Sequence, residues 1–492
     1  MLPNSVIFAT KKHCRQNKSV LPFPKAEKIF EIRGQMAYTI EISNNCEKSV
    51  KQYYIKTFGC QMNVYDSQRI AAILQTLGYQ ETQTPREADL VIFNTCHIRE
   101  KAAEKVFSDL GRLNLIREER RTAGKDMIIG VVGCVVQAED EQIAQRAPFV
   151  DFATGPLTYH RLPEILEKIR RKKGRPIIDT EFPAEAKFDF LPPNSNTAPC
   201  AFLAIQEGCD NFCTYCVVPY TRGAEYSRPV EDILCEARRL ADNGCLEINL
   251  LGQNVNSYHG EDTAGKERNL AYLLRRLAEI EGLKRLRYTT SYPADMTDEL
   301  IACHHDLAKL MPYLHLPVQS GSDAVLKAMN RRHTSSDYLR IVEKLKKANP
   351  AIGMSSDFIV GFPGETDADF EATLGLVREV GFIQAFSFKY SRRAGTPAAV
   401  MPGQVDEKIK TTRLNILQEL LSAQQLTFNQ SCIGKTMPVL FESKGRGKNT
   451  LYGRTPYMQN LNAELDKKYL NQIVNVEITA AGMNTLSGKL KG

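Results

Sequence analysis

The chain of 492 residues is too long for one ordinary hydrophobic core, so we expect two to four domains. Hydrophobic residues make up 43% and charged residues 25%, which is typical of a soluble globular protein, and the net charge of +7 permits a polyanionic partner without requiring one. The longest strongly apolar stretch, 127–136, is about half of the roughly 20 residues that a membrane-spanning helix needs, which excludes an integral membrane protein.

The first fifty residues show no clear periodicity and mix basic with scattered apolar residues. We expect residues 1–50 to form an appended N-terminal extension. Because they contain no signal-peptide hydrophobic region, the sequence predicts a cytoplasmic protein. Thirteen cysteines, an odd number, then favour metal ligation over disulfide bonds.

Strands that alternate with helices are predicted for residues 51–190. Apolar, β-rich segments at 53–58, 89–94 and 127–132 are followed by helical stretches at 66–77, 99–120 and 139–146. This alternation predicts an α/β domain with a parallel sheet that is covered on both faces. The polar, proline-rich run 192–199 is predicted to be a linker.

A second series of six strands follows, at 202–206, 247–251, 285–291, 313–318, 355–360 and 382–389. Six β/α units predict an incomplete (β/α)6 barrel over 195–428, whose chemistry belongs at the C-terminal ends of the strands. After a helix at 406–428, short β-like segments at 437–442 and 474–478 predict a small β-barrel over 430–492.

Three cysteines in a CxxxCxxC run, Cys209, Cys213 and Cys216, directly follow the first strand of the second series. The spacing brings three thiolates together on one loop, which suits a [4Fe–4S] cluster with one iron left open. An open iron can bind a reactant, whereas an electron-transfer ferredoxin binds its cluster through four cysteines. A structural zinc site is the alternative, although zinc prefers paired CxxC motifs and a fourth Cys or His.

A second set, Cys60, Cys96 and Cys134, lies just beyond the three strands of the first domain. Because residues past the carboxyl ends of parallel strands converge, we expect these thiols to meet and to hold a second cluster. Three unrelated buried cysteines are the alternative. Nearby polar residues could donate hydrogen bonds to cluster sulfurs, although turn and capping roles explain them equally well: Asn63, Asn94, Thr95 and Gln137.

Taken together, these cysteine motifs resemble the radical S-adenosylmethionine methylthiotransferase family. The resemblance rests on Gly-Cys-Gln-Met-Asn at 59–63, Asn-Thr-Cys at 94–96, Gly-Cys at 133–134 and the CxxxCxxC loop. It covers about 50–492 and implies a methylthiotransferase domain, a radical barrel and a C-terminal TRAM domain. The runs 217–223 and 250–258 are most similar to the branch that acts on tRNA.

The resemblance implies a reaction at N6-dimethylallyladenosine, at position 37 beside the tRNA anticodon. In the family, the barrel cluster cleaves S-adenosylmethionine to a 5′-deoxyadenosyl radical that removes hydrogen from C2 of the base. The second cluster carries a sulfur that is methylated and delivered as a methylthio group. An aromatic C–H carbon is too unreactive for acid–base substitution, so cofactors must carry this step.

The implied partners are the anticodon arm of tRNA, an electron donor such as flavodoxin or ferredoxin, and a sulfur source. Threonylcarbamoyl-adenosine in tRNA and a ribosomal-protein side chain are alternative substrates. An electron carrier or RNA-binding scaffold is the non-enzymatic alternative, against which two open-iron sites argue.

Residues at the strand ends of the barrel are candidates for binding S-adenosylmethionine. The resemblance places the ring of Tyr215, inside the cysteine loop, against adenine. The other candidates are Gly252, Gln253, Asn254, Gln319, Ser320 and Gly364. Each could equally belong to an ordinary βα turn. The sequence indicates no catalytic residue beyond the cluster ligands.

The C-terminal segment carries most of the excess positive charge, since nine Lys or Arg and four Asp or Glu lie within 430–492. Its basic residues interleave with tyrosines, which predicts an RNA platform that uses phosphate attraction and base stacking. A solvated basic surface over core tyrosines is the alternative. The RNA-binding candidates are Lys444, Arg446, Lys448 and Arg454.

Overall fold

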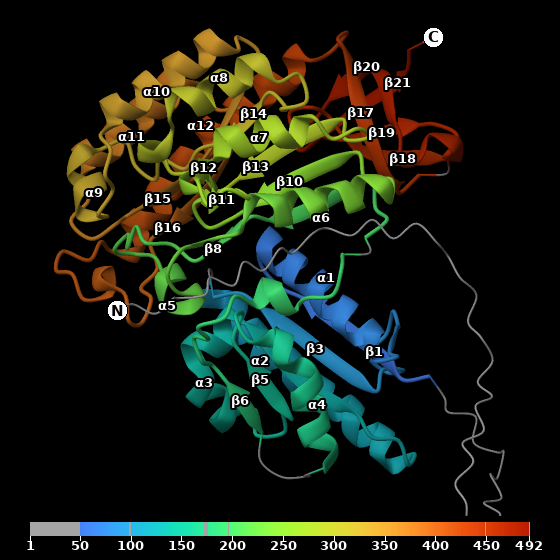
Figure 1. Cartoon of the computed structure of the whole chain (residues 1–492). Coiled ribbons are helices and arrows are strands. Elements are labelled where there is room, and N and C mark those ends of the chain that lie inside the picture. The colour runs from blue at the N-terminus through green and yellow to red at the C-terminus, as the bar shows by residue number, and fades with distance from the viewer. Residues whose placement is uncertain (1–49, 98–99, 172–175, 195, 448, 492) are drawn as a thin grey trace, which may run out of the picture. The chain divides into compact units, whose positions relative to one another are not determined.

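The computed structural model describes residues 50–97, 100–171, 176–194, 196–447 and 449–491 (Figure 1). The predicted N-terminal extension lies outside these residues, apart from Val50. No helix in the described ranges combines the length and apolarity that crossing a membrane requires.

The first domain is built on a six-stranded parallel sheet with the order β2-β1-β3-β4-β5-β6. The order turns back at β1, which lies between β2 and β3. Its strands are β1 Gln52–Thr57, β2 Gln80–Glu81, β3 Leu90–Thr95, β4 Ile128–Gly133, β5 Phe152–Thr154 and β6 Ile177–Asp179. Its helices are α1 Gln61–Thr76, α2 Glu100–Thr122, α3 Cys134–Arg146 and α4 Leu162–Arg171, with 3-10 turns η1 Tyr159–Arg161 and η2 Lys187–Phe190. The three predicted strands and three predicted helices are confirmed.

Burial explains why this sheet is parallel and central. Every residue of β3 is buried, which requires helices on both faces of the sheet. Two apolar clusters, one containing Val91 and Phe93 and the other Leu90 and Ile92, cover the two faces. The alternation of side chains along β3 therefore places the core on both sides.

The second domain has six parallel strands in two groups of three, β13-β10-β7 and β14-β15-β16, which a parallel bridge between Leu286 and Leu310 links (Figure 1). The strands are β7 Cys200–Ala204, β10 Glu247–Leu251, β13 Arg285–Thr289, β14 Tyr313–His315, β15 Gly353–Val360 and β16 Gln384–Lys389. The helices are α6 Val230–Asp242, α7 Leu270–Ala278, α8 Asp298–Asp306, α9 Asp323–Ala328, α10 Ser335–Ala348 and α11 Asp367–Val380. This arrangement confirms the incomplete six-stranded barrel.

Shorter elements decorate the barrel. They are α5 Val218–Arg222, the hairpins β8 Gln206–Glu207 with β9 Tyr226–Ser227 and β11 His259–Glu261 with β12 Glu267–Asn269, and the 3-10 turns η3 Val255–Ser257, η4 Pro293–Asp295 and η5 Pro397–Ala399. Barrel strands β13 and β14 end earlier than predicted, and β16 begins two residues later than predicted. The predicted strand 285–291 ends at Thr289, because Thr290 has a positive φ of 77°. The predicted strand 313–318 ends at His315, shortly before Pro317, which has no N–H to donate.

Helix α12, Glu407–Ser431, leads into a closed five-stranded barrel with the order β17-β18-β19-β21-β20. Its elements are β17 Thr436–Lys444, β18 Thr450–Arg454, β19 Asn460–Glu464, η6 Lys467–Tyr469, β20 Ile473–Ala481 and β21 Thr485–Leu490. The two predicted segments are β17 and β20. Closure leaves no unpaired strand edge.

Buried arginines attach the small barrel to the large one. The Arg285 guanidinium donates to the carbonyl oxygen of Pro438 at 2.6 Å, and Arg287 donates to that of Pro456 at 2.8 Å. Glu247 forms ion pairs with both arginines. Arg285 begins β13, so the attachment lies where the barrel strands begin, whereas the Cys209 loop follows the end of β7.

Candidate functional site

The first cysteine set lies at the point where the strand order of the N-terminal sheet turns back. Cys60 and Cys96 follow β1 and β3, and Cys134 begins α3 directly after β4. In open α/β sheets, ligands bind in the crevice outside the carboxyl ends of strands at such a switch point. The structure therefore places the three cysteines where the sequence predicted them.

Two glycines let the strand-end turns approach one another. Gly59 and Gly133 have φ angles of +109° and +106°, which favour glycine. A Cβ atom on Gly133 would lie 2.4 Å from the carbonyl oxygen of Thr95, so any other residue would push the turns apart. The Gly-Cys pairs in the sequence thus have a steric reason.

Asparagine side chains link the turns that carry Cys60 and Cys96. Asn63 Nδ2 donates to the Thr95 carbonyl at 2.8 Å and to Asn94 Oδ1 at 2.9 Å, and Asn63 Oδ1 accepts from Cys60 Sγ at 3.1 Å. Thr95 Oγ1 donates to the carbonyl of Val132 at 2.8 Å. These contacts support the turn role that the sequence left open. Gln137 donates instead to the Thr180 carbonyl, at 2.7 Å.

The pKa values of Cys60 and Cys134 are shifted in opposite directions. A hydrogen bond with Cys96, the charge of Arg222 and backbone N–H groups at the start of α1 lower the pKa of Cys60 to about 6 against the effect of burial. Burial raises the pKa of Cys134, and Arg222 opposes that shift. These contacts favour the thiolate form of Cys60, which is the form that binds metals.

The second cysteine set lies on the loop between β8 and α5. Asn211 Nδ2 donates to Cys209 Sγ at 3.5 Å, and the Arg331 guanidinium donates to Cys213 Sγ at 3.7 Å. Burial, and then the neighbouring Cys213, raise the pKa of Cys216 to about 12. A bound metal centre would favour the thiolate form of Cys216.

The donor chemistry of both sets fits an iron–sulfur cluster better than zinc. Each set offers three cysteines, whereas a structural zinc site takes a fourth Cys or His. A cubic cluster can be held by three thiolates when one of its irons is left open.

Several predicted cofactor residues pack around the cysteine loop. The Tyr215 ring contacts the Phe362 ring edge-on at 6.5 Å between centroids, which joins the loop to the segment after β15. Gln253 Oε1 accepts from the Gly208 N–H at 2.7 Å, directly before Cys209. Gln253 thus positions the start of the cysteine loop.

The neighbours of Gln253 are closely packed. A Cβ on Gly252 would lie 2.4 Å from Gln206 Oε1, which also accepts from the Asn254 N–H at 3.0 Å. The Asn254 amide donates to Asp295 at 2.7 Å, while its buried Oδ1 has no hydrogen-bond partner. An unpaired buried acceptor is unusual and fits a residue that meets a ligand.

The remaining three cofactor candidates differ in character. Gln319 has a φ of +77°, a strained conformation of the kind that clusters at ligand sites. The Ser320 hydroxyl bonds with the Thr373 hydroxyl of α11 at 3.3 Å, a structural contact. Gly364 has a φ of +83° and donates its N–H to the Gly403 carbonyl, which is a turn role.

The basic candidates of the small barrel fall into three groups. Lys444 and Arg446 are exposed at the β17–β18 turn, and Lys448 lies outside the described residues. Arg454 forms an ion pair with Glu442 at 2.6 Å, so part of its charge is compensated.

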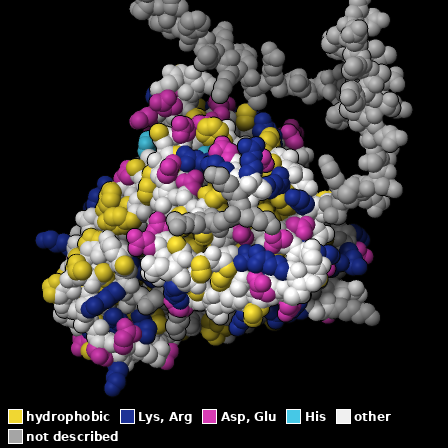
Figure 2. All heavy atoms as spheres, turned by 90° about the horizontal axis from the view of Figure 1, so that it is seen from below, with side chains coloured by type: hydrophobic (Ala, Val, Ile, Leu, Met, Phe, Trp, Pro, Cys, Tyr) yellow, Lys and Arg dark blue, Asp and Glu magenta, His cyan; other side chains and the backbone are white. Residues whose placement is uncertain are grey.

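On the face of the molecule seen in Figure 2, Lys and Arg side chains are interspersed with Asp and Glu, without one continuous basic area.

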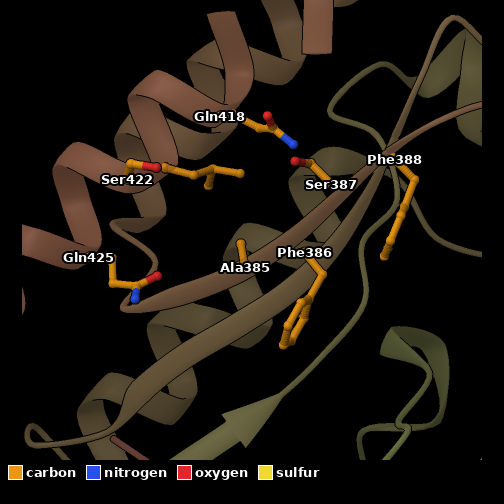
Figure 3. Close-up of a pocket in the computed structure, with 8 residues that line it drawn as sticks. Ala385, Phe386, Ser387, Phe388, Gln418, Ser422 and Gln425 are labelled. Atoms are coloured by element: carbon orange, nitrogen blue, oxygen red, sulfur yellow. The ribbon is translucent and has the colours of Figure 1, made fainter. Parts of the chain in front are cut away.

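A hollow of about 290 Å³ lies between β16 and α12. In Figure 3, Ser387 points toward Gln418 of α12, whereas Phe386 and Phe388 point away from that helix. None of the cysteines of either set and none of the predicted cofactor residues lines this hollow. It is therefore separate from the candidate site.

Two arginines at the cysteine sets, Arg331 and Arg222, were not among the predicted site residues, although Arg222 lies in the run 217–223. They lie far along the chain from the residues they contact, and a single sequence carries no signal for such pairs. Arg331 stacks on the Tyr292 ring at 4.2 Å besides its contact with Cys213.

A six-stranded incomplete barrel with a three-cysteine loop after its first strand is the architecture of radical S-adenosylmethionine enzymes. Residues 203–377 match the radical SAM superfamily, residues 430–491 match the TRAM domain, and residues 52–155 match uncharacterized protein family UPF0004. The fold is similar to that of the radical S-adenosylmethionine methyltransferase TsrM from Kitasatospora setae. The TM-score is 0.52 at 13% identity, covering 71% of this chain and 77% of that one.

Two curated relatives match almost over their full lengths. The tRNA-2-methylthio-N(6)-dimethylallyladenosine synthase of Maricaulis maris is 55% identical over 90% of this chain and 98% of its own. The enzyme of the same name from Agrobacterium fabrum is 56% identical over the same shares. The chain belongs to the tRNA-2-methylthio-N(6)-dimethylallyladenosine synthase family.

Proposed function

We propose that this protein converts N6-dimethylallyladenosine of tRNA, at position 37 beside the anticodon, to its 2-methylthio derivative. The identity of 55% to a synthase of that name, over 98% of its length, carries the proposal. Two cysteine sets at strand ends support it, because a reaction that both generates a radical and inserts sulfur needs two cofactor sites.

The radical SAM superfamily implies S-adenosylmethionine and a [4Fe–4S] cluster. We infer two clusters, one held by Cys209, Cys213 and Cys216 and the other by Cys60, Cys96 and Cys134. When bound, these groups supply the deoxyadenosyl radical that takes hydrogen from C2 and the sulfur that replaces it.

The side chains around the barrel cysteines orient the cysteine loop and would bind S-adenosylmethionine. Gln253 fixes the start of the cysteine loop through the Gly208 N–H, and Tyr215 packs the loop against Phe362. The unpaired Oδ1 of Asn254 and the strained Gln319 are the groups that we assign to S-adenosylmethionine. Exclusion of water by the buried neighbours of this loop protects a reactive radical.

The exposed basic residues Lys444 and Arg446 provide a contact for tRNA phosphates. The anticodon arm is the part of tRNA that must reach the clusters. A one-electron donor such as flavodoxin or ferredoxin and a sulfur source complete the reaction. The protein would work in the cytoplasm, where its tRNA substrate is found.

Two measurements test the proposal in sequence. Anaerobic iron and sulfide analysis of the reconstituted protein should give about eight irons per chain, four for each cube. The protein is then incubated with prenylated tRNA, S-adenosylmethionine and reductant, and the nucleosides are analysed by mass spectrometry. We expect the 2-methylthio nucleoside. About four irons would contradict the second cluster, and a product found on a ribosomal protein or on threonylcarbamoyl-adenosine would contradict the substrate.

A further inference from the structure

Four buried charged side chains form a ring at the contact between the N-terminal domain and the barrel. Lys187 Nζ lies 3.2 Å from Asp66 and 2.7 Å from Glu207, and Arg222 lies 2.7 Å from Asp66 and 2.6 Å from Glu207. Each side chain is 4% exposed or less. Two cations and two anions therefore balance one another away from water.

The ring joins segments that are distant in sequence. Asp66 lies on α1, Lys187 on the η2 turn, Glu207 on β8 and Arg222 on α5. Lys187 Nζ also donates to the Pro156 carbonyl at 3.0 Å. One ring thus connects the helix after Cys60, the segment between the domains and both ends of the CxxxCxxC loop.

Stability alone gives little reason for this arrangement. Burying ions is costly, and a buried ion-pair network often contributes no more than well-packed apolar residues of similar volume. A hydrogen-bonded ring fixes the orientation of the segments that carry it, because each carboxylate oxygen must face a particular N–H group. Apolar packing would allow the two domains to slide more easily.

Arg222 also reaches the first cysteine set. Its charge acts on the thiols of both Cys60 and Cys134. Helix α5, which carries Arg222, packs against α3, whose first residue is Cys134. Glu207, which Arg222 binds, lies two residues before Cys209. This single guanidinium therefore faces one cluster site and is tied to the other.

We propose that Arg222 is a positioning residue that, through Asp66, Lys187 and Glu207, fixes the site of Cys60, Cys96 and Cys134 relative to that of Cys209, Cys213 and Cys216. The proposal rests on the proposed function, because only a reaction that uses both sites in one turnover needs a fixed spacing between them. Deoxyadenosine formation needs the barrel site alone and does not depend on the spacing between the two sites.

The test uses the full-length, reconstituted protein and the double variant Asp66→Asn/Arg222→Gln. This variant keeps Lys187 and Glu207 as a balanced pair and so avoids a lone buried charge. Arg222→Lys is the conservative variant. Arg117→Gln is the matched control, because Arg117 is a buried arginine of the N-terminal domain that pairs with Asp151 at 3.3 Å.

We expect the double variant to retain both clusters and to lose less deoxyadenosine formation than methylthio product, because Lys187 still pairs with Glu207 at the start of the CxxxCxxC loop. The methylthio product per deoxyadenosine should fall at least tenfold, and Arg222→Lys should recover part of that ratio. The magnetic coupling between the two reduced clusters, read from electron paramagnetic resonance spectra, should change in the double variant and not in Arg117→Gln.

Two results would overturn the proposal. One is an unchanged coupling together with an unchanged product ratio. The other is an equal loss of deoxyadenosine and product in a folded variant, which would mean a merely structural role. If wild-type protein modifies no tRNA, the proposed function fails by itself, and the magnetic coupling still decides whether Arg222 sets the spacing.

Discussion

Gly59 lies against Cys96, so a Cβ atom on Gly59 would stand 2.1 Å from Cys96 Cβ and 2.8 Å from its sulfur. The two residues lie just beyond the ends of adjacent strands of the N-terminal sheet, β1 and β3. Any side chain at position 59 would therefore displace a cysteine of the first set. The cysteines of the first set can keep their spacing only because Gly59 has no Cβ atom.

Gly59→Ala should accordingly disrupt the first cluster and spare the second. The positive φ of Gly59 alone costs alanine about 1–2 kcal/mol, and the clash adds to that cost. We expect roughly half of the wild-type iron content, measured on reconstituted protein. Gly78→Ala is the control, since Gly78 has a φ of +81° and nothing within 4 Å of its Cβ position. Equal iron loss in both variants would show that strain, and not the contact, is responsible.

Cys213→Ala should abolish deoxyadenosine formation. Cys213 is a member of the barrel loop, and without it only two thiolates remain there for the cluster that binds S-adenosylmethionine. The first cluster should persist, so the protein keeps about half of its iron. Chromatography of the reaction mixture measures deoxyadenosine. Residual formation near the wild-type rate would remove Cys213 from the ligand set.

Cys96→Ala should abolish methylthio transfer and leave deoxyadenosine formation intact. The barrel site is untouched, so cleavage of S-adenosylmethionine continues, but no methylthio group is transferred to tRNA. Nucleoside mass analysis and deoxyadenosine measurement on the same sample test this. Cys303→Ala is a suitable control, because Cys303 is buried in the barrel core and belongs to neither set. Methylthiolation by the Cys96 variant would show that our division of labour is wrong.

The cysteine positions could be predicted from the sequence because they follow from local rules. Each of Cys60, Cys96 and Cys134 comes directly after a β-rich segment, and parallel strands bring their ends together. The tertiary contacts of the arginines could not be predicted. Arg222 and its partner Asp66 are 156 residues apart, and Arg331 and Cys213 are 118 apart. Hydrophobic periodicity places elements but does not specify which buried charges face one another.

The short strands were also beyond prediction, for a related reason. β5 and β6 have three residues each and β8 has two, too few for an alternation to be recognised. In the small barrel, composition alone does not predict which basic residues are free to bind tRNA. Its positive charge is evident in the sequence, but only the structure reveals that Arg454 is paired with Glu442.

Charge reversal at the small barrel should weaken tRNA binding. Lys444→Glu/Arg446→Glu changes two exposed residues of one turn. Each lost phosphate contact should reduce the slope of log K against log salt by roughly 0.7–0.9. Filter binding at several salt concentrations measures this slope. Lys327→Glu/Lys347→Glu, an equal charge change on α9 and α10, is the control.

Deleting 430–492 would be a poorer test, because Arg285 and Arg287 would lose the backbone carbonyls that they bind in the small barrel. Buried cations without partners destabilise the barrel itself. An unchanged affinity and salt slope in the reversal variant would contradict the contribution of Lys444 and Arg446 to tRNA binding.

Acid should destabilise the protein in part through His304. Burial lowers the pKa of His304 to about 4 from 6.5, and Tyr288 bonds to its ring at 2.7 Å. The neutral ring is favoured in the folded state, so this contribution is complete above pH 6.5 and is lost as the pH falls toward 4. At 1.4 kcal/mol for each pKa unit, the loss amounts to roughly 3 kcal/mol.

Urea unfolding followed by circular dichroism at pH 7 and pH 4.5 measures the effect of His304→Gln. This variant should be less stable than wild type at pH 7 because the buried ring is lost. The deficit should shrink at pH 4.5, where wild type is destabilised because its ring is protonated in the unfolded chain and mostly neutral in the folded one. Tyr288→Phe keeps the imidazole buried, so it should retain the acid sensitivity of wild type. A deficit of His304→Gln that stays constant between the two pH values would mean that His304 does not titrate on unfolding.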